Sequence, residues 1–362
     1  MRAIFDAHLD LAWNALQWNR DITQPLADVR AAEATMTDHR ARGWGTVTLP
    51  ELRRARVGAC LGTVLARAKP LVRPEAGFKR RDLDYCTQSI ASAVACGQAV
   101  YYEMLATQGR IRPIRTRRDL DHHWSAWSAA ANTEPIGMIL AMEGADPIVD
   151  PPDAQRWWDR GLRCVGLAHY GPSHYAVGTG AEGPLTDNGR ALLREFERLG
   201  MIVDLTHCSE PGFFEVLDRF SGPVHASHNM CRALVPGDRQ FSDEQIRSLV
   251  QRGAVIGMAL DAWMLHPGWV IGRTRPDVVS MTAVADHIDY ICQIAGSARH
   301  VGIGSDLDGG FGTEQTPGDF DSIADLHKLD PILANRGYSD ADIDAIFFGN
   351  WLRFFSEALP QR

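Results

Sequence analysis

Short apolar runs alternate with longer amphipathic segments along most of the chain. Each run is bounded by Gly, Pro, Asp or Asn, which is typical of buried strands in a parallel sheet. The predicted strands cover residues 3–9, 57–65, 136–142, 162–168, 201–206, 223–227, 254–260 and 301–305.

Helix signals lie between most of these runs. In segment 186–199 an apolar stripe at helical spacing leads up to Gly200, a residue that favours a helix end. Ser242 and Gln245 have the spacing of a capping box, which predicts a helix that begins there and ends near residue 253. Two longer helices are predicted over residues 82–105 and 339–355.

Strands that alternate with helices indicate a parallel sheet, and eight of them predict a (β/α)8 TIM barrel. A barrel of this kind usually needs about 250 residues. We assign the surplus of this 362-residue chain to long connections after the first and second strands and to a C-terminal helical tail. No repeat or linker interrupts the sequence, so we expect one domain over residues 1–362. A doubly wound sheet is the alternative, but it usually has a Gly-rich loop where this chain has His8 and Asp10.

Ionisable side chains stand at the ends of most predicted strands. The first strand is unusual, because Asp6, His8 and Asp10 alternate within IFDAHLDLAW and would share one face. Active sites of such barrels lie at the carboxyl ends of the strands, so we expect a polar ring at the mouth. The members of this ring are His8, Asp10, Glu143, His169, His207, His228 and Asp306.

Histidine nitrogens and carboxylate oxygens are suitable ligands for Zn²⁺ or a similar divalent ion. The ring contains more candidate ligands than the three that a protein supplies to one catalytic zinc. This number favours two ions about 3.5–4 Å apart. Two cations so close need an anionic bridge. Glu143 is the candidate, because it is the only acid of the ring on a middle strand. Asp6 is the weaker candidate and is interpreted as a supporting or structural residue.

Charge and cysteine content restrict the remaining possibilities. The net charge of −8 argues against a surface that binds nucleic acid. The seven cysteines are scattered without a C-x-x-C pair, which indicates reduced thiols rather than disulfides or a zinc finger. The first residues lack the apolar segment of a signal peptide, and no run of about 18 apolar residues occurs. We therefore expect a cytoplasmic protein with neither a membrane nor a nucleic-acid partner.

The motifs at the strand ends resemble, in order, those of the membrane dipeptidase (renal dipeptidase) family of the amidohydrolase superfamily. They read DAHLDLAW, MEGAD, GLAHYG, VDLTHCS, ASHN and VGIGSDLDG, and the similarity extends to PELRRARVGACLGTVLAR and GNWLRFF. The resemblance implies a (β/α)8 barrel with two zinc ions. It also implies hydrolysis of dipeptides through a hydroxide that bridges the two metals.

The resemblance assigns a role to each metal ligand. His8 and Asp10 match the ligands of the first metal. His207 and His228 match the ligands of the second, and Glu143 matches the bridging carboxylate.

Three further residues match catalytic or substrate-binding positions of the family. Asp306 matches the acid beside the first metal that shuttles the proton, and His169 matches a histidine near the reacting carbonyl. Arg239 falls where the family has an arginine for the carboxylate of the substrate. This assignment rests on spacing. The alternative roles of Arg239 are a surface salt bridge and a cap on the helix that begins near Ser242.

The chain also departs from the mammalian members of the family. After His169 it reads YGPSHYAVGTG, where the mammalian enzymes differ, and it lacks their signal peptide and lipid anchor signal. The substrate preference and the membrane attachment of the mammalian enzymes are therefore not assigned to this chain. One alternative is a related hydrolase of N-acyl amino acids, lactones or β-lactams. A non-catalytic metal-binding protein fits less well, since a pure binding site does not need Asp306. A homodimer is plausible for the family.

Overall fold

The computed structural model describes residues 1–69, 83–130 and 133–361. Its main sheet contains eight strands that coincide with the predicted apolar runs. Only one of them extends beyond its run, by the single residue Glu143. The strands are β1 (Ile4–Leu9), β2 (Val57–Leu65), β6 (Ile136–Glu143), β7 (Leu162–Gly166), β8 (Ile202–Asp204), β9 (Val224–His225), β10 (Ile256–Met258) and β11 (Val301–Ile303).

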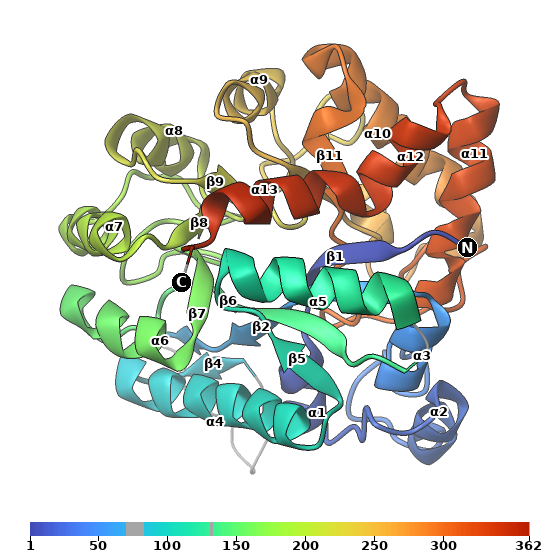
Figure 1. The fold of residues 1–362 in the computed structure, drawn as a ribbon, viewed down its shortest axis with the longest axis horizontal. Helices are drawn as coiled ribbons and strands as arrows, with labels where there is room; N and C mark the ends of the chain where they lie inside the picture. The colour runs from blue at the N-terminus through green and yellow to red at the C-terminus, as the bar shows by residue number, and fades with distance from the viewer. Residues whose placement is uncertain (70–82, 131–132, 362) are drawn as a thin grey trace.

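These strands form a nearly closed parallel ring. Their order is β10-β11-β1-β2-β6-β7-β8-β9. The two ends of this series meet where Ala226, directly after β9, pairs with Ile256 in β10. Helices surround the ring (Figure 1). The predicted TIM-barrel fold is therefore confirmed.

Helices fill the connections between the strands, and their caps follow the predicted signals. Thr186 caps α7, which ends at Gly200 in the left-handed conformation. Ser242 and Gln245 form the complete capping box of α9. Among the described helices, none has both the length and the apolar character needed to cross a membrane. The α-helices are α1 (Leu11–Gln17), α2 (Leu26–Glu33), α3 (Leu49–Arg54), α4 (Gln88–Thr107), α5 (Arg117–Ala130), α6 (Ala154–Arg160), α7 (Asp187–Leu199), α8 (Glu210–Arg219), α9 (Asp243–Gln251), α10 (Met281–Ala295), α11 (Leu329–Asn335), α12 (Asp340–Asp344) and α13 (Asn350–Ala358).

Two predicted helices differ from the structure. The helix predicted over 82–105 begins only at Gln88, because Thr87 caps it there, and residue 82 lies outside the described residues. The segment 339–355 is not a single α-helix. A π-helical turn at Ala345–Gly349 separates α12 from α13.

Three short strands in the connection after β2 are absent from the prediction. The strands β3 (Arg67–Ala68) and β4 (Asp84–Tyr85) pair with each other, and β5 (Ile111–Pro113) pairs with β6. Strands of two or three residues are too short to show a periodic pattern. The pair β3–β4 matters for the site, because it sets Arg67 opposite Asp84.

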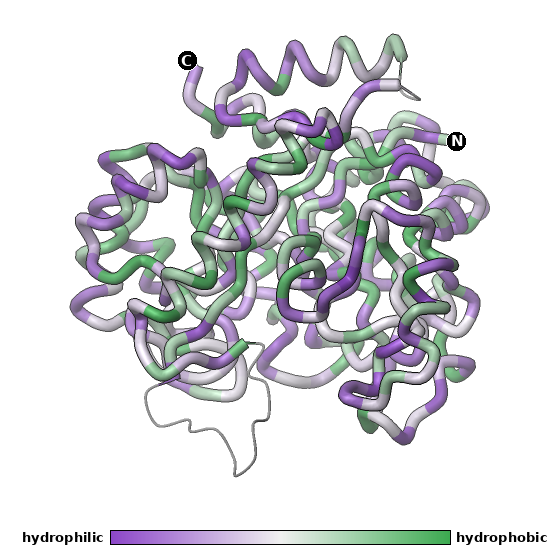
Figure 2. Tube along the Cα trace, turned by 90° about the horizontal axis from the view of Figure 1, so that it is seen from below, coloured by the Kyte–Doolittle hydropathy of each residue, from purple (hydrophilic) through white to green (hydrophobic). Residues whose placement is uncertain are grey.

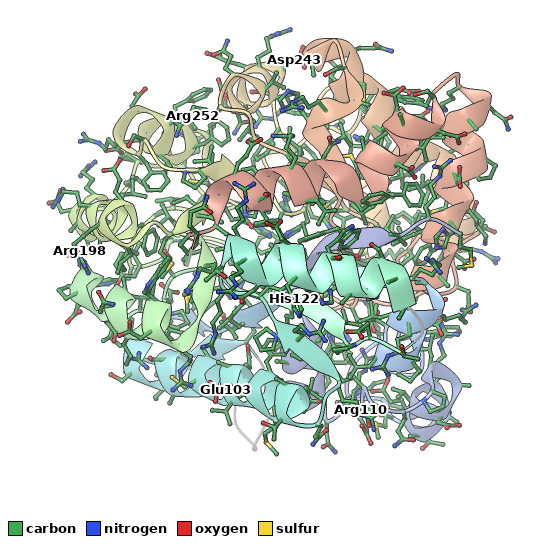
Figure 3. The ribbon with its side chains drawn as sticks, in the orientation of Figure 1. Glu103, Arg110, His122, Arg198, Asp243 and Arg252 are labelled. Carbon is green, nitrogen blue, oxygen red and sulfur yellow. The ribbon has the colours of Figure 1, made fainter. Side chains whose placement is uncertain are left out.

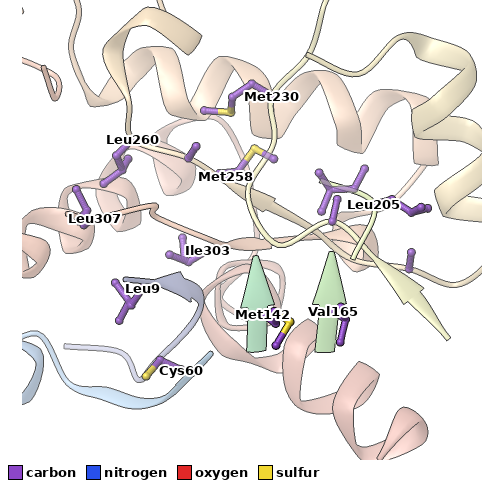
Figure 4. Packing of buried hydrophobic residues seen from close by; sticks show 14 of the residues in the cluster. Leu9, Cys60, Met142, Val165, Leu205, Met230, Met258, Leu260, Ile303 and Leu307 are labelled. Atoms are coloured by element: carbon purple, nitrogen blue, oxygen red, sulfur yellow. The ribbon is translucent and has the colours of Figure 1, made fainter. Parts of the chain in front are cut away.

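Apolar side chains pack between the strands and the helices. This outer layer includes Leu9, Met142 and Ile303 (Figure 4). The helices in Figure 2 carry both hydrophilic and hydrophobic turns, as expected of elements with one buried face. Charged side chains such as Glu103 and Arg198 lie on the outer surface (Figure 3). The seven cysteines all lie in the described part of the chain and form no disulfide bond there.

A second apolar cluster fills the barrel at the amino ends of its strands. Since residues from strands around the ring contact one another in this cluster, it lies inside the barrel. Figure 1 looks onto this end, where α5 and α13 cross in front of the strands. The opposite, carboxyl end is therefore the open mouth. The cluster includes Phe5, Ala59, Leu61, Ile139, Cys164 and Ile202 from the strands and Trp351, Phe354 and Phe355 from α13.

Candidate active site

Six ionisable residues meet inside the mouth of the barrel, and Glu143 lies among them. Its Oε1 is 3.3 Å from the Nε2 atoms of both His207 and His228. Its Oε2 is 3.6 Å from the Nε2 of His8. The other two members, Asp10 and Asp306, each place a carboxylate oxygen 3.8 Å from the same nitrogen of His8.

The ligand atoms of these residues form overlapping groups in which all atoms lie within 4.8 Å of one another. One group contains His8, Asp10 and Glu143, and a second contains Glu143, His207 and His228. A third group joins His8 and His228 to Asp306. The structure thus brings together all six residues that the sequence nominates as metal ligands. Two of the groups share Glu143.

The negative charge of this cluster has no arginine or lysine partner in the described part of the chain. Asp10, Glu143 and Asp306 contact only histidines as ion-pair partners. Burial raises the pKa of Asp306 well above its ordinary value, and nearby carboxylates add to the effect although His8 opposes it. Burial also lowers the pKa of His228 to about 3 and that of His207 well below its usual range. Both imidazoles are therefore neutral, which is the form that binds a metal.

The donor atoms fit a divalent cation. The Nε2 of His8 is buried without a hydrogen-bond partner, and the Nε2 atoms of His207 and His228 lie 3.3 Å apart. The Nδ1 atoms of His207 and His228 each lie close to a hydroxyl group. Thr179 Oγ1 is 3.0 Å from the Nδ1 of His207, and Ser227 Oγ is 2.9 Å from the Nδ1 of His228. Such outer contacts orient histidines that bind metals.

His169 lies beside the cluster, in the loop after β7. Its Nε2 is 3.7 Å from Oε1 of Glu143, and its Nδ1 is 3.2 Å from Nη1 of Arg67. Arg67 in turn donates from Nε to Asp84 at 2.6 Å. Because a guanidinium can only donate, Nδ1 of His169 accepts and its proton resides on Nε2. Burial lowers the pKa of His169 to about 3, so the ring is neutral and its N–H faces the cluster.

Arg239 is buried and extends into the same region. Its Nη2 donates to the backbone oxygen of His228 at 2.9 Å, while its Nη1 has no partner among the described residues. The helix near Ser242 has its own capping box with Gln245. A surface salt bridge or a helix cap is therefore not the role of Arg239.

Asp6 does not join the cluster. It accepts hydrogen bonds from the backbone nitrogen and hydroxyl of Ser305, at 2.9 and 2.5 Å, and from the backbone nitrogen of His8 at 3.1 Å. The pairing of β1 with β2 shifts register between Asp6 and Leu9. The expected alternation along the first strand is therefore interrupted. Asp6 ties β1 to the end of β11, in agreement with its interpretation as a structural residue.

Most of the site residues line a cavity that is open to solvent, with about 460 Å³ of empty space including open solvent. Asp261 is part of its wall and is absent from the predicted ring. It directly follows the predicted run 254–260, so the rule that found the other strand ends would also have found Asp261. Arg67 had no such signal, because its strand has two residues. The lining includes Trp13, Glu143, His169, Tyr170, His207, His228, Arg239, Asp261, Trp263, Met264 and Asp306.

Comparison with known proteins identifies the family. The family model for membrane dipeptidases (Peptidase family M19) matches residues 2–360. The chain belongs to the membrane dipeptidase family. An uncharacterised protein of Klebsiella pneumoniae is 26% identical over 273 residues, which are 73% of this chain and 95% of that protein. Dipeptidase aclJ of Aspergillus oryzae is 30% identical over 227 residues, which are 61% of this chain and about half, 51%, of that relative.

Solved structures of membrane dipeptidase family members have the same fold. The structure of dipeptidase AC, a metallopeptidase of family M19, has a TM-score of 0.78 at 22% identity and covers 100% of this chain and 99% of its own. A metallopeptidase from Rhodobacter sphaeroides, solved with a phosphinate mimic of L-Ala-D-Ala, has a TM-score of 0.76 at 23% identity and covers 99% of each chain. Membership of a metallopeptidase family and the buried cluster together indicate that this dipeptidase-family chain binds metal.

Proposed function

We propose that this chain is a metal-dependent dipeptidase that holds two divalent cations, most suitably Zn²⁺, at the mouth of its barrel. The observation that carries the proposal is that Glu143 belongs to two of the groups of candidate metal ligands. One of its oxygens faces His207 and His228, and the other faces His8. Two cations at close distance need one anion between them, and such a carboxylate suits that role. Asp10 completes the nitrogen and oxygen ligands that Zn²⁺ accepts.

When bound, the cations would supply a water of lowered pKa and positive charge near the scissile carbonyl. The chain itself supplies the proton acceptor. The carboxylate of Asp306 lines the cavity and accepts no hydrogen bond from the described residues. It takes the proton of the attacking water and delivers it to the leaving amine, as general base and then general acid.

His169 stabilises the negative charge that develops on the carbonyl oxygen. Its neutral ring donates from Nε2, on the side that faces Glu143. Arg67 maintains this arrangement by donating to Nδ1, and Asp84 holds Arg67 in place. A donor that is oriented before the reaction needs no rearrangement as charge develops.

Arg239 selects the length of the substrate. Arg239 lines the cavity, and its guanidinium, whose buried Nη1 is unpaired among the described residues, can bind the carboxylate at the C-terminus of a dipeptide. That contact favours substrates that end one residue after the scissile bond. The dipeptidase name of the Aspergillus relative and the dipeptide mimic in the Rhodobacter structure support the same substrate class.

A substrate panel tests the proposal against its closest alternative. The panel contains Ala-Ala, Ala-Ala-Ala, N-acetyl-alanine and a simple lactone, each assayed with the Zn²⁺-loaded protein. We expect Ala-Ala to have the highest kcat/KM and the tripeptide to be cleaved far more slowly. A clear preference for N-acetyl-alanine or for the lactone would replace the dipeptidase with a hydrolase of another bond.

A further inference from the structure

Asp261 places a buried carboxylate in the wall of the substrate cavity. It follows β10 and is only 6% exposed. The Nε2 of Gln315 lies 2.9 and 3.1 Å from its two oxygens, and the backbone nitrogen of Trp263 donates more weakly at 3.4 Å. These neutral donors hold the carboxylate in one orientation. The side chain of Trp263 also acts on the carboxylate as a neutral hydrogen-bond donor.

The charge of Asp261 has no counter-ion within the described protein. Among the described residues, the hydrogen bonds to its oxygens come from the neutral groups of Gln315 and Trp263. Burial raises the pKa of Asp261 to about 7. A carboxylate in such surroundings gains most from a ligand that brings a positive charge, since the buried pair then replaces an unpaired ion.

Arg239 is the complementary group in the same cavity. Its guanidinium is buried with Nη1 unpaired, and it acts on Asp261 electrostatically without forming an ion pair with it. The cavity wall thus offers one unpaired cation and one unpaired anion. Trp263 and Met264 line the same cavity, and their apolar surfaces suit the aliphatic part of a long side chain.

We propose that Asp261 determines specificity for the C-terminal residue of the substrate, favouring dipeptides that end in Lys or Arg. This inference rests on the proposed function, in which Arg239 binds the α-carboxylate of that same residue. In this proposal the α-carboxylate binds Arg239 and the side chain of the same residue extends toward Asp261, which lines the same cavity and is within electrostatic reach of Arg239. An acidic side chain at that position would meet the like charge of Asp261 and be disfavoured.

The test compares Ala-Lys with Ala-norleucine and Ala-Glu, using the Zn²⁺-loaded wild type, Asp261→Asn and Asp218→Asn. Norleucine has the four-carbon side chain of lysine without its ammonium group. Asp218 is an exposed residue of α8, so its variant removes the same charge far from the cavity. A charge-assisted hydrogen bond corresponds to roughly 10- to 150-fold in kcat/KM. We expect the wild type to prefer Ala-Lys over Ala-norleucine by at least about 10-fold and to cleave Ala-Glu most slowly.

Asp261→Asn should bring the Ala-Lys to Ala-norleucine ratio close to one, mainly through KM, whereas Asp218→Asn should keep the wild-type ratio. A uniform loss for all substrates, including Ala-Ala, would overturn the inference and assign Asp261 to the α-ammonium group or to the fold. A wild-type ratio near one would overturn it even if the Asn variant does not fold. If no dipeptide is cleaved, the proposed function itself fails. If Ala-Ala is cleaved but Asp261→Asn leaves the Ala-Lys to Ala-norleucine ratio unchanged, the inference about Asp261 is wrong and the proposed function stands.

Discussion

The two ends of the barrel interior are chemically opposite. At the amino ends of the strands, aliphatic and aromatic side chains fill the space and α13 covers them. Phe5 stacks on Phe355 there at a centroid distance of 5.3 Å, and the indole nitrogen of Trp351 donates to the backbone oxygen of Ile303. At the carboxyl ends, the same strands present imidazoles and the carboxylates of Asp10, Glu143 and Asp306, which have no arginine or lysine ion-pair partner among the described residues.

This difference separates stability from function within one ring of strands. The apolar end is stable without a ligand. Burial removes its apolar surface from water, and the indole nitrogen of Trp351 has a hydrogen-bond partner. The polar end is unfavourable for the protein alone, because buried carboxylates without cations are costly. A ligand that brings positive charge relieves that cost. The polar end is therefore the part of the barrel that is suited to bind metal.

The largest effect is expected from removing the aromatic filling of the apolar end. Trp351→Ala leaves a cavity at a fully buried position, which costs about 3–5 kcal/mol in the free energy of unfolding. The measurement is urea denaturation, with Ala-Ala turnover per folded molecule as a second readout. Trp44→Ala is the control, since that side chain is 52% exposed, and should change stability by less than about 0.5 kcal/mol. A large loss of kcat in folded Trp351→Ala would contradict the separation of the two ends.

The next effect concerns proton transfer at the polar end. Asp306→Asn keeps the shape of the side chain but cannot accept the proton, so kcat should fall at least about 10²-fold, or ~2.7 kcal/mol in the barrier. The metal-free variant should be no less stable than the metal-free wild type, because an unpaired buried carboxylate has been removed. Steady-state kinetics and thermal melts measure both. A kcat close to that of the wild type would assign the proton transfer to another group.

A smaller effect is expected at Arg239. Arg239→Ala should lower kcat/KM for Ala-Ala by roughly 10- to 150-fold, through loss of a charge-assisted contact. Amidation of the dipeptide should cost the wild type a similar factor. The two losses should not add, because each removes the same contact. If the wild type cleaves the amide as well as the free dipeptide, Arg239 does not bind the carboxylate.

The smallest effect is expected from Arg67, which acts through His169. Arg67→Met removes the donor to Nδ1 and should lower kcat by about 2- to 10-fold, with KM nearly unchanged. Arg67→Lys keeps a donor and should recover part of the rate. Nitrogen NMR of the histidines provides the decisive readout, since the Met variant should gain the Nδ1–H form of His169. An unchanged tautomer would mean that Arg67 does not orient the ring.

Strong local patterns predicted the barrel and most of its mouth. Every strand of the ring lies at an apolar run of the sequence, because buried parallel strands are apolar on both faces. The residues at the ends of those strands converge because parallel strands bring their carboxyl ends to one side. His8, Glu143 and His207 could therefore be placed near one another before any coordinates were known.

The remaining features depend on contacts that are distant in the sequence. Arg67 reaches His169 across 102 residues, and its partner Asp84 comes from another two-residue strand. The irregular pairing that separates Asp6 from the cluster arises between strands and not within β1. The π-helical turn before α13 likewise interrupts a segment whose apolar pattern is that of one helix. Asp261 is different, because its position at a strand end was readable from the sequence.

Metal titration tests the central claim that the polar end of the barrel is completed by cations. The protein is freed of metal with a chelator, and Zn²⁺ is added back while bound metal and Ala-Ala hydrolysis are measured together. The account predicts no hydrolysis in the metal-free sample, full activity at two ions per chain, and fewer than two ions bound by Glu143→Gln. Hydrolysis of Ala-Ala at the full rate in a sample shown to contain no metal would contradict the account.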